Sequence, residues 1–379
     1  MTDKQALVLR TPDNFAAALQ HLIGFVPSQS LIAVALSSGE NGEPVRVTLT
    51  QRIDLPRSPQ DNAVVAGHVV DAMSKYASGA VLLAVYSERD QETGVRGEPT
   101  DQLPYAALVD QVIGDLDDQG ISTQEAMLTN GGRRWSYGCT DPVCCPAEGN
   151  AIPWAVKSQI AAEFAVAGAV SVGSRSDLEM ELAHVDDPDV VEAIKGTEVS
   201  EMVYKQGAKG KKSATLRDLY VMDLHGLASK GQKLAPAEVA MVVTSLKDIR
   251  IRDTYLWDLT KESSPESRRA AAAMLAQVVR EAPPELVAPA ATVLAVQQWQ
   301  LGDGARANVA LARANEAEAD YGLAVLVGHS MRVGLPPSAW AEAMQNLSRD
   351  ECLRGPGAAS SRAAAPAAVT APPTQGLAL

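Results

Sequence analysis

The sequence predicts an α/β protein of the α+β kind, with a mixed sheet and its helices first and an α-helical domain of stacked helical hairpins second. Up to about residue 154, apolar or alternating segments typical of strands are interspersed with segments of helical periodicity. Beyond residue 155 the strand patterns fade. Helical segments then follow one another with short connections containing Pro or Gly, which is typical of antiparallel helix pairs.

The first helix and the two strands after it have clear boundaries. The Thr-Pro-Asp sequence at residues 11–13 is a helix start, because a capping hydroxyl precedes a proline at the first helical position. Gly24 ends this helix, and residues 30–36 are apolar as in a buried strand. Residues 45–53 alternate between apolar and polar side chains, which is typical of a half-exposed strand. We expect the two strands to pair through a turn at residues 39–44.

Helices and strands continue to alternate in the rest of the first part. Helices are expected over residues 60–77 and 104–118, with an uncharged central strand over residues 79–86 between them. Two further strands, at residues 125–129 and 133–137, flank an Asn-Gly-Gly sequence. This sequence indicates a tight hairpin, because the turn needs positive φ angles. A helix-layered mixed sheet fits this order of elements best.

The second part is expected to be helical apart from one exposed loop. Residues 196–212 are polar and contain Gly207, Gly210 and four lysines, so we predict the loop there. Helices are predicted over residues 155–167, 213–230, 235–248, 265–282, 286–300, 303–316, 320–333 and 336–348. The chain then divides into a mixed α/β domain (residues 1–154), a mainly α-helical domain (155–350) and a disordered tail rich in Ala and Pro (351–379).

Composition and charge disfavour several classes of function. The net charge of −13 opposes binding to nucleic acid and to anionic lipid, since both require a basic surface. No run of about 20 apolar residues is present, so no transmembrane helix is expected. The N-terminal sequence lacks the apolar core of a secretory signal. We therefore expect a cytoplasmic location, in which the four cysteines are reduced.

Three segments, in this order, resemble the signature of a known family. Residues 22–32, LIGFVPSQSLI, resemble the pattern LGF-x-P-x-x-S-L-V, with Ile23 in place of the usual leucine. Residues 52–56, RIDLP, resemble R-x-D-L-P, and residues 135–146, WSYGCTDPVCCP, resemble W-S-x-x-C-x-D-P-x-C-C-P. Together they are similar to an actinobacterial family known only as a domain of unknown function, number 4192. The resemblance implies a bacterial or phage-borne cytoplasmic protein, but no activity, cofactor or catalytic residue.

The cysteines of the third segment are the candidate metal ligands. Cys139, Cys144 and Cys145 lie close together, and the spacing of the first two would let both sulfurs reach one zinc ion. The residues that could supply a fourth ligand are Cys352, His68, His184, His225 and Asp141. Because the chain has no second spaced pair of cysteines, we predict no cofactor and keep zinc as the alternative.

Two other interpretations of the same cysteines remain open. A redox pair would join Cys139 to Cys144 or Cys145 more easily than it would join the two adjacent cysteines, whose bond requires a strained peptide. A purely structural interpretation places small apolar side chains in a turn fixed by prolines and packed against Trp135 and Trp154.

A second candidate site surrounds the loop between the first helix and the first strand. Junctions of this kind often border clefts. The candidate ligand-binding residues are Phe25, Ser28, Ser30, Arg52, Asp54 and Trp135. A nucleophilic serine is disfavoured, because the G-x-S-x-G elbow is absent and no histidine is tied to either serine by spacing. A structural turn would also explain the loop.

No recognised catalytic set is present in the sequence, so we lean against an enzyme. We expect a protein-interaction or small-ligand-binding role, with a protein partner bound through the helical domain. The alternatives are an enzyme with its site at Phe25–Ser30, Asp54 and Cys139–Cys145, or a zinc or thiol redox module. Polar groups converging in a pocket would favour a ligand-binding or catalytic site. Three sulfurs directed at one point, with a fourth ligand nearby, would favour the zinc or thiol module.

Overall fold

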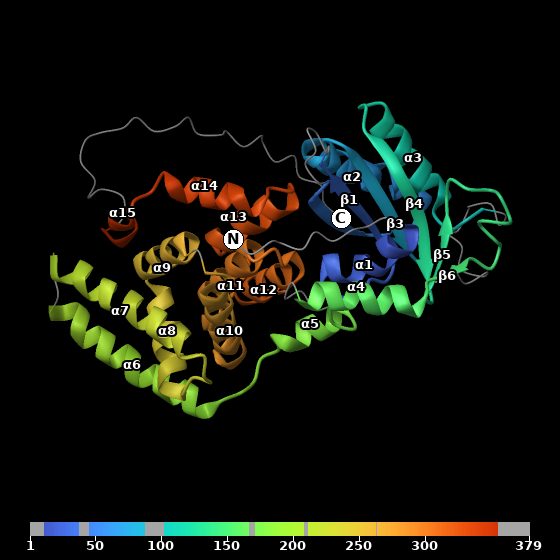
Figure 1. The fold of residues 1–379 in the computed structure, drawn as a ribbon. Helices are drawn as coiled ribbons and strands as arrows, with labels where there is room; N and C mark the ends of the chain where they lie inside the picture. Colours follow the sequence, from blue (N-terminus) through green and yellow to red (C-terminus); the bar gives the residue numbers. More distant parts are fainter. Residues whose placement is uncertain are drawn as a thin grey trace.

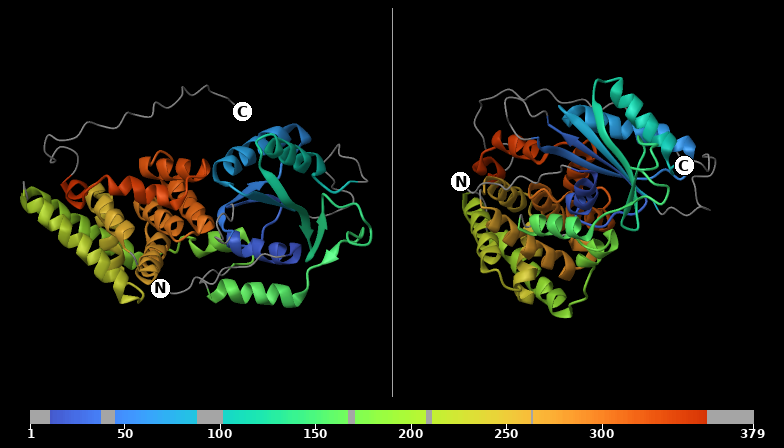
Figure 2. Two further views of the ribbon diagram at one scale, coloured as in Figure 1. Left: turned by 45° about the horizontal axis from the view of Figure 1, so that its top comes forward. Right: turned by 45° about the vertical axis from the view of Figure 1, so that its right-hand side comes forward.

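A computed structural model of the chain shows a six-stranded mixed sheet with helices on both faces, continued on one side by a helical layer (Figures 1 and 2). The structure describes residues 11–37, 45–87, 102–166, 171–207, 211–262 and 264–354. The predicted α/β class is confirmed. Within the described ranges, no helix combines the length and the apolar content that crossing a membrane requires.

The sheet contains one parallel pair of strands between antiparallel neighbours. The strands are β1 (Ser30–Leu36), β2 (Val47–Asp54), β3 (Ala80–Tyr86), β4 (Ser122–Asn130), β5 (Arg133–Ser136) and β6 (Asn150–Ala151), in the spatial order β2-β1-β3-β4-β5-β6. β3 and β4 are parallel, and α3 (Ala106–Asp117) lies in the crossover between them. The expected pairings of β1 with β2 and of β4 with β5 are confirmed. The expected turn at residues 39–44 lies outside the described residues.

The central strands bury both of their faces. On β1, Leu31 and Ala33 face a core formed with α2 (Asn62–Tyr76) and α3, whereas Ile32 and Val34 belong to a second core on the opposite face. The second core continues through α1 (Pro12–Ile23) into the helical layer. Two-sided burial explains why β1 and β3 carry no charged side chain.

The loop after α1 is fixed at both of its ends. α1 begins with a cap, in which the Thr11 side chain accepts a hydrogen bond from Asn14 N–H, and ends at Gly24 with a φ of 85°. Val172 then pairs with this loop, donating to Gly24 O and accepting from Val26 N–H at 3.0 and 3.1 Å. The loop therefore reaches β1 in a defined conformation.

The helical layer is built around one helix that is buried on nearly every side. Its helices are α5 (Arg175–Glu181), α6 (Pro188–Gly207), α7 (Lys211–Lys230), α8 (Pro236–Lys247), α9 (Ile249–Lys261), α10 (Pro265–Glu281), α11 (Ala288–Gln300), α12 (Gly304–Ala317), α13 (Gly322–Arg332), α14 (Pro337–Gln345) and α15 (Arg349–Arg354), with the short 3-10 helix η3 (Pro284–Leu286). α4 (Trp154–Val166) packs against α1, and the 3-10 helix η2 (Pro59–Asp61) comes just before α2. The central helix, α11, is rich in alanine and valine and packs against α10 and α12. Small side chains allow this close approach.

Three predictions about the second part were wrong. Residues 196–207 were expected in a loop but continue α6, because Val190 and Ile194 anchor this helix in the core; residues 208–210 lie outside the described residues. α9 was missed because its inward face is partly polar, with Arg252 and Thr260 buried. The first residues of the expected tail belong to α15, and residues 355–379 lie outside the described residues.

An ion-pair cluster holds α15 against the helices that precede it. Arg349 contacts both carboxylate oxygens of Asp258 on α9, at 2.7 and 3.0 Å, and reaches Asp218 on α7 at 2.7 Å. Asp258 also lies 3.2 Å from His225 Nε2, and its side chain is 16% exposed. Burial alone would raise the pKa of Asp258, but the hydrogen bonds with His225 and Arg349 hold that pKa below its usual value.

Replacing Arg349 by methionine is expected to lower the free energy of unfolding by about 1–3 kcal/mol, because it leaves the half-buried Asp258 carboxylate short of its cation. The matched control is Arg354→Met, which removes an exposed pair with Asp350 on the same helix and is expected to cost about 0.5 kcal/mol or less. Urea denaturation at neutral pH measures both. Equal effects of the two variants would contradict the role given to the cluster.

Candidate functional site

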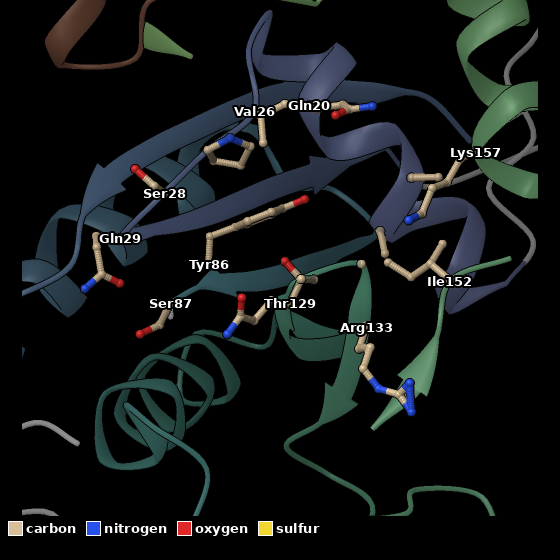
Figure 3. Close-up of a pocket in the computed structure, with 16 residues that line it drawn as sticks. Gln20, Val26, Ser28, Gln29, Tyr86, Ser87, Thr129, Arg133, Ile152 and Lys157 are labelled. Atoms are coloured by element: carbon tan, nitrogen blue, oxygen red, sulfur yellow. The ribbon is translucent and has the colours of Figure 1, made fainter. Parts of the chain in front are cut away.

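A cavity of about 350 Å³ lies at the edge of the sheet where the parallel strands β3 and β4 end (Figure 3). Its walls come from α1, the loop before β1, the ends of β3 and β4, the β4–β5 turn and the start of α4. The carboxyl ends of parallel strands commonly border ligand sites, because the chain leaves the sheet there and diverges. The cavity thus occupies a favourable place in the fold.

The β4–β5 turn brings its own backbone close to the ammonium group of Lys157 at the cavity. Gly131 and Gly132 have φ angles of 56° and 79°, and Asn130 pairs with Arg133 across them, as in a two-residue type I′ turn. A Cβ atom on Gly132 would lie 2.8 Å from Nζ of Lys157, which reaches the turn from α4. Glycine at this position therefore allows the ammonium group to approach the turn.

Two cationic side chains line the cavity. Arg133 and Lys157 are both in the lining, and among the residues that the structure describes the lining contains no Asp or Glu. Arg133 donates through Nε to the Glu148 carbonyl oxygen at 2.8 Å. Lys157 forms no ion pair with any residue that the structure describes. On a chain with a net charge of −13, this local excess of positive charge favours an anionic ligand.

Hydroxyl groups provide most of the remaining polarity of the cavity. They belong to Ser28, Tyr86, Ser87 and Thr129. Burial raises the pKa of Tyr86 to about 12, and the nearby Thr129 hydroxyl offsets only part of that rise, so the phenol keeps its proton at neutral pH. The Thr129 Oγ1 atom is buried, and its near partner in the described part of the chain is the Tyr86 hydroxyl, which it does not meet in regular hydrogen-bond geometry. A buried hydroxyl without a well-formed hydrogen bond costs free energy.

The loop Phe25–Ser30, proposed from the sequence as part of a site, lines the cavity through Val26, Pro27, Ser28 and Gln29, and of the six individual candidate residues Ser28 is the one in the described lining. Four others form a network beside it that supports the loop. Arg52 donates to Ser30 Oγ at 2.8 Å, pairs with Asp54 at 2.5 Å and lies over the Phe25 ring, 5.9 Å from its centroid. Ser30 in turn donates to the backbone oxygen of Ser28 at 2.7 Å. The network therefore acts on the cavity by holding the loop in place.

Trp135 is in β5, and the three cysteines lie in the long connection between β5 and β6. Trp135 donates through Nε1 to Ala147 O at 3.0 Å. The sulfur atoms of Cys139, Cys144 and Cys145 all lie within 4.8 Å of one another. Trp154 is 81% exposed, so the expected packing of the cysteines against it is absent.

None of the proposed fourth ligands joins the three cysteines. The cluster of possible metal ligands found in the described part of the chain consists of these cysteines alone. Cys352 is on α15, His184 contacts Asp186, His225 contacts Asp258, and His68 is on α2. Asp141 is in the same loop, where its carboxylate accepts a hydrogen bond from Val143 N–H at 2.8 Å.

Sequence reasoning missed the residues that define the cavity, among them Tyr86, Thr129 and Lys157. The Asn-Gly-Gly sequence was recognised as a turn, but its nearness to α4 depends on strand order, which no local pattern states. Position near the end of a strand is the signal that could have pointed to Tyr86 and Thr129, because these residues pair with each other at the ends of the parallel strands β3 and β4. Lys157 carries no comparable signal.

Comparison with known proteins identifies one family. A family model described as "Domain of unknown function (DUF4192)" matches residues 12–338. No curated protein and no solved structure matches the chain. The matched range includes the cavity and the three cysteines and stops within α14, so that α15 lies beyond it.

Replacing Thr129 by valine is expected to raise the free energy of unfolding by about 1 kcal/mol, because it removes a buried hydroxyl that lacks a well-formed hydrogen bond while keeping the β-branched shape. Thr292→Val on α11 is the matched control, since this buried hydroxyl donates to Ala288 O at 2.8 Å and its loss should give no gain. Urea denaturation without added ligand measures both changes. A loss of stability in Thr129→Val would show that the hydroxyl is paired in the folded protein.

Proposed function

We propose that the cavity at the ends of β3 and β4 binds a small organic anion. The chain belongs to the DUF4192 family, which is described only as a domain of unknown function. The observation that carries the proposal is the composition of the lining, whose described residues include Arg133 and Lys157 and no carboxylate. The ligand-binding role expected from the sequence is thereby given a location and a charge.

The anionic group of the ligand would lie at the β4–β5 turn. Lys157 supplies an ammonium group beside Gly132, and the two glycines leave the backbone of the turn open to close approach. Lysine binds phosphate and carboxylate groups as a compact point charge. A charged hydrogen bond in a partly enclosed cavity is stronger than the same bond in water.

The rest of the ligand would meet a surface that is polar on one side and apolar on the other. The hydroxyl of Tyr86 and the amide of Gln20 offer hydrogen bonds, while Val26 and Ile152 offer apolar contact (Figure 3). A volume of about 350 Å³ is at the small end of the range for ligand pockets. Sugar phosphates, nucleoside monophosphates and hydroxylated carboxylic acids match this combination of size, charge and polarity.

Binding is favoured over catalysis by the same lining. Its described residues include no histidine, cysteine or carboxylate that could act as a general base near neutral pH. Tyr86, with a pKa of about 12, serves better as a hydrogen-bond donor than as a base. The expected protein partner of the helical layer, the absence of nucleic-acid binding and the cytoplasmic location stay predictions.

Thermal denaturation with inorganic phosphate, sugar phosphates, nucleoside monophosphates and hydroxy acids at constant ionic strength is expected to identify a stabilising anion. Titration calorimetry then measures its affinity. Lys157→Met should weaken this affinity by about 10- to 100-fold, because a hydrogen bond to a charged group contributes about 1.5–3 kcal/mol.

The matched control is Lys195→Met, on the exposed surface of α6, which should leave the affinity unchanged. Equal weakening in both variants would mean that the anion responds only to overall charge. In that case, or if no anion of the panel binds, the proposal is wrong.

A further inference from the structure

We propose that Cys139, Cys144 and Cys145 bind one thiophilic metal ion, with Zn²⁺ as the metal to test, through three thiolates and with a fourth coordination position open to solvent. This inference does not depend on the anion cavity. It depends on where the sulfur atoms lie, on what holds their loop and on which other donors are near.

The three sulfur atoms converge closely enough to share one ion. All three lie within 4.8 Å of one another, with 3.7 Å between the sulfurs of Cys144 and Cys145 and 2.8 Å between those of Cys139 and Cys144. Zinc–sulfur bonds of about 2.3 Å place two thiolates on a tetrahedral ion about 3.8 Å apart. The distance between the sulfurs of Cys144 and Cys145 already fits. The other distance needs to widen by about 1 Å, which rotation of the exposed Cys144 side chain can supply.

Hydrogen bonds within the loop fix the backbone that carries the sulfurs. Cys145 N–H donates to Asp141 O and Val143 N–H to the Asp141 carboxylate, both at 2.8 Å. The Asn150 side chain donates to Cys144 O, also at 2.8 Å. These bonds span both sides of the pair Cys144-Cys145. Metal binding would therefore require little ordering of the backbone.

The base of the loop is attached to β5 as well. Arg133 and Trp135 donate to the carbonyl oxygens of Glu148 and Ala147 at 2.8 and 3.0 Å. Gly149 has a φ of 74°, and a Cβ atom there would lie 2.3 Å from Cε2 of Trp135, so the strand returns directly against the indole ring. The cysteines thus occupy a closed turn whose two ends are held by hydrogen bonds to β5.

The donor set selects both the class of metal and the form of the site. Thiolates favour zinc and monovalent copper over magnesium and calcium, which prefer oxygen. The described residues place no fourth protein donor with the three sulfurs, and Cys144 is exposed. Three protein ligands with one open position is the form that zinc sites keep when water or another small ligand binds. A disulfide would use two of the sulfurs, whereas a metal ion accounts for all three.

Zinc titration of the reduced, metal-free full chain against a chromophoric chelator tests the proposal, and Co²⁺ serves as a spectroscopic probe. We expect one equivalent of Zn²⁺ per chain, release of thiol protons on binding, and intense thiolate-to-cobalt absorption. Cys139→Ser, Cys144→Ser and Cys145→Ser should each weaken Zn²⁺ binding by more than about 100-fold, the most that loss of a mere supporting partner costs. Cys352→Ser, on α15, is the matched control and should change nothing.

Asn150→Ala tests whether the loop positions the sulfurs. It should weaken Zn²⁺ binding by about 10-fold while the stoichiometry stays at one, because all three ligands remain. Circular dichroism of each variant checks that the fold is kept. The proposal is overturned if folded serine variants bind Zn²⁺ as tightly as the unaltered chain. It is also overturned if the reduced chain binds no Zn²⁺ and air oxidation instead joins Cys139 to Cys144.

Discussion

Burial of β1 and β3 on both faces is the constraint on which the rest of this structure depends. A strand with apolar side chains on both sides cannot lie at a solvent-facing sheet surface, so each face of the sheet requires a helical cover. α2 and α3 cover one face (Figure 1). The other face is covered by α1, and the same core continues without interruption to α11. The helical layer is therefore part of what makes the sheet stable.

Strand direction explains why two distant loops meet at the cavity. β3 and β4 run parallel and end together, and β1, which is antiparallel to β3, begins at the same edge. The loop after α1 and the turn after β4 consequently meet there and enclose the cavity. These two loops are far apart in the sequence and are brought together by the antiparallel pairing of β1 with β3 and the parallel pairing of β3 with β4. β5 is antiparallel to β4, so the connection that carries the cysteines leaves the sheet after Ser136, opposite Met127 and away from the cavity end of β4.

Local patterns predicted the elements whose partners are also local. The uncharged strands and the Asn-Gly-Gly turn belong to this group, since periodicity and φ requirements are properties of neighbouring residues. α9 was missed because its buried polar groups find partners far along the chain: Arg252 contacts Tyr321, and Thr260 accepts a hydrogen bond from Trp340. The candidate sites divide in the same way. The cysteines share one loop and were found, whereas the cavity is defined by residues that only strand order brings together.

α15 packs against helices of the matched region although it lies beyond the end of the family match. The family match ends at residue 338, yet Arg349, beyond that limit, is the cation for Asp258 and Asp218 within it. A chain that stopped at the end of the match would leave two neighbouring carboxylates beside His225 with their shared counter-ion gone. The segment that the family model matches therefore ends before a residue that neutralises two of its carboxylates.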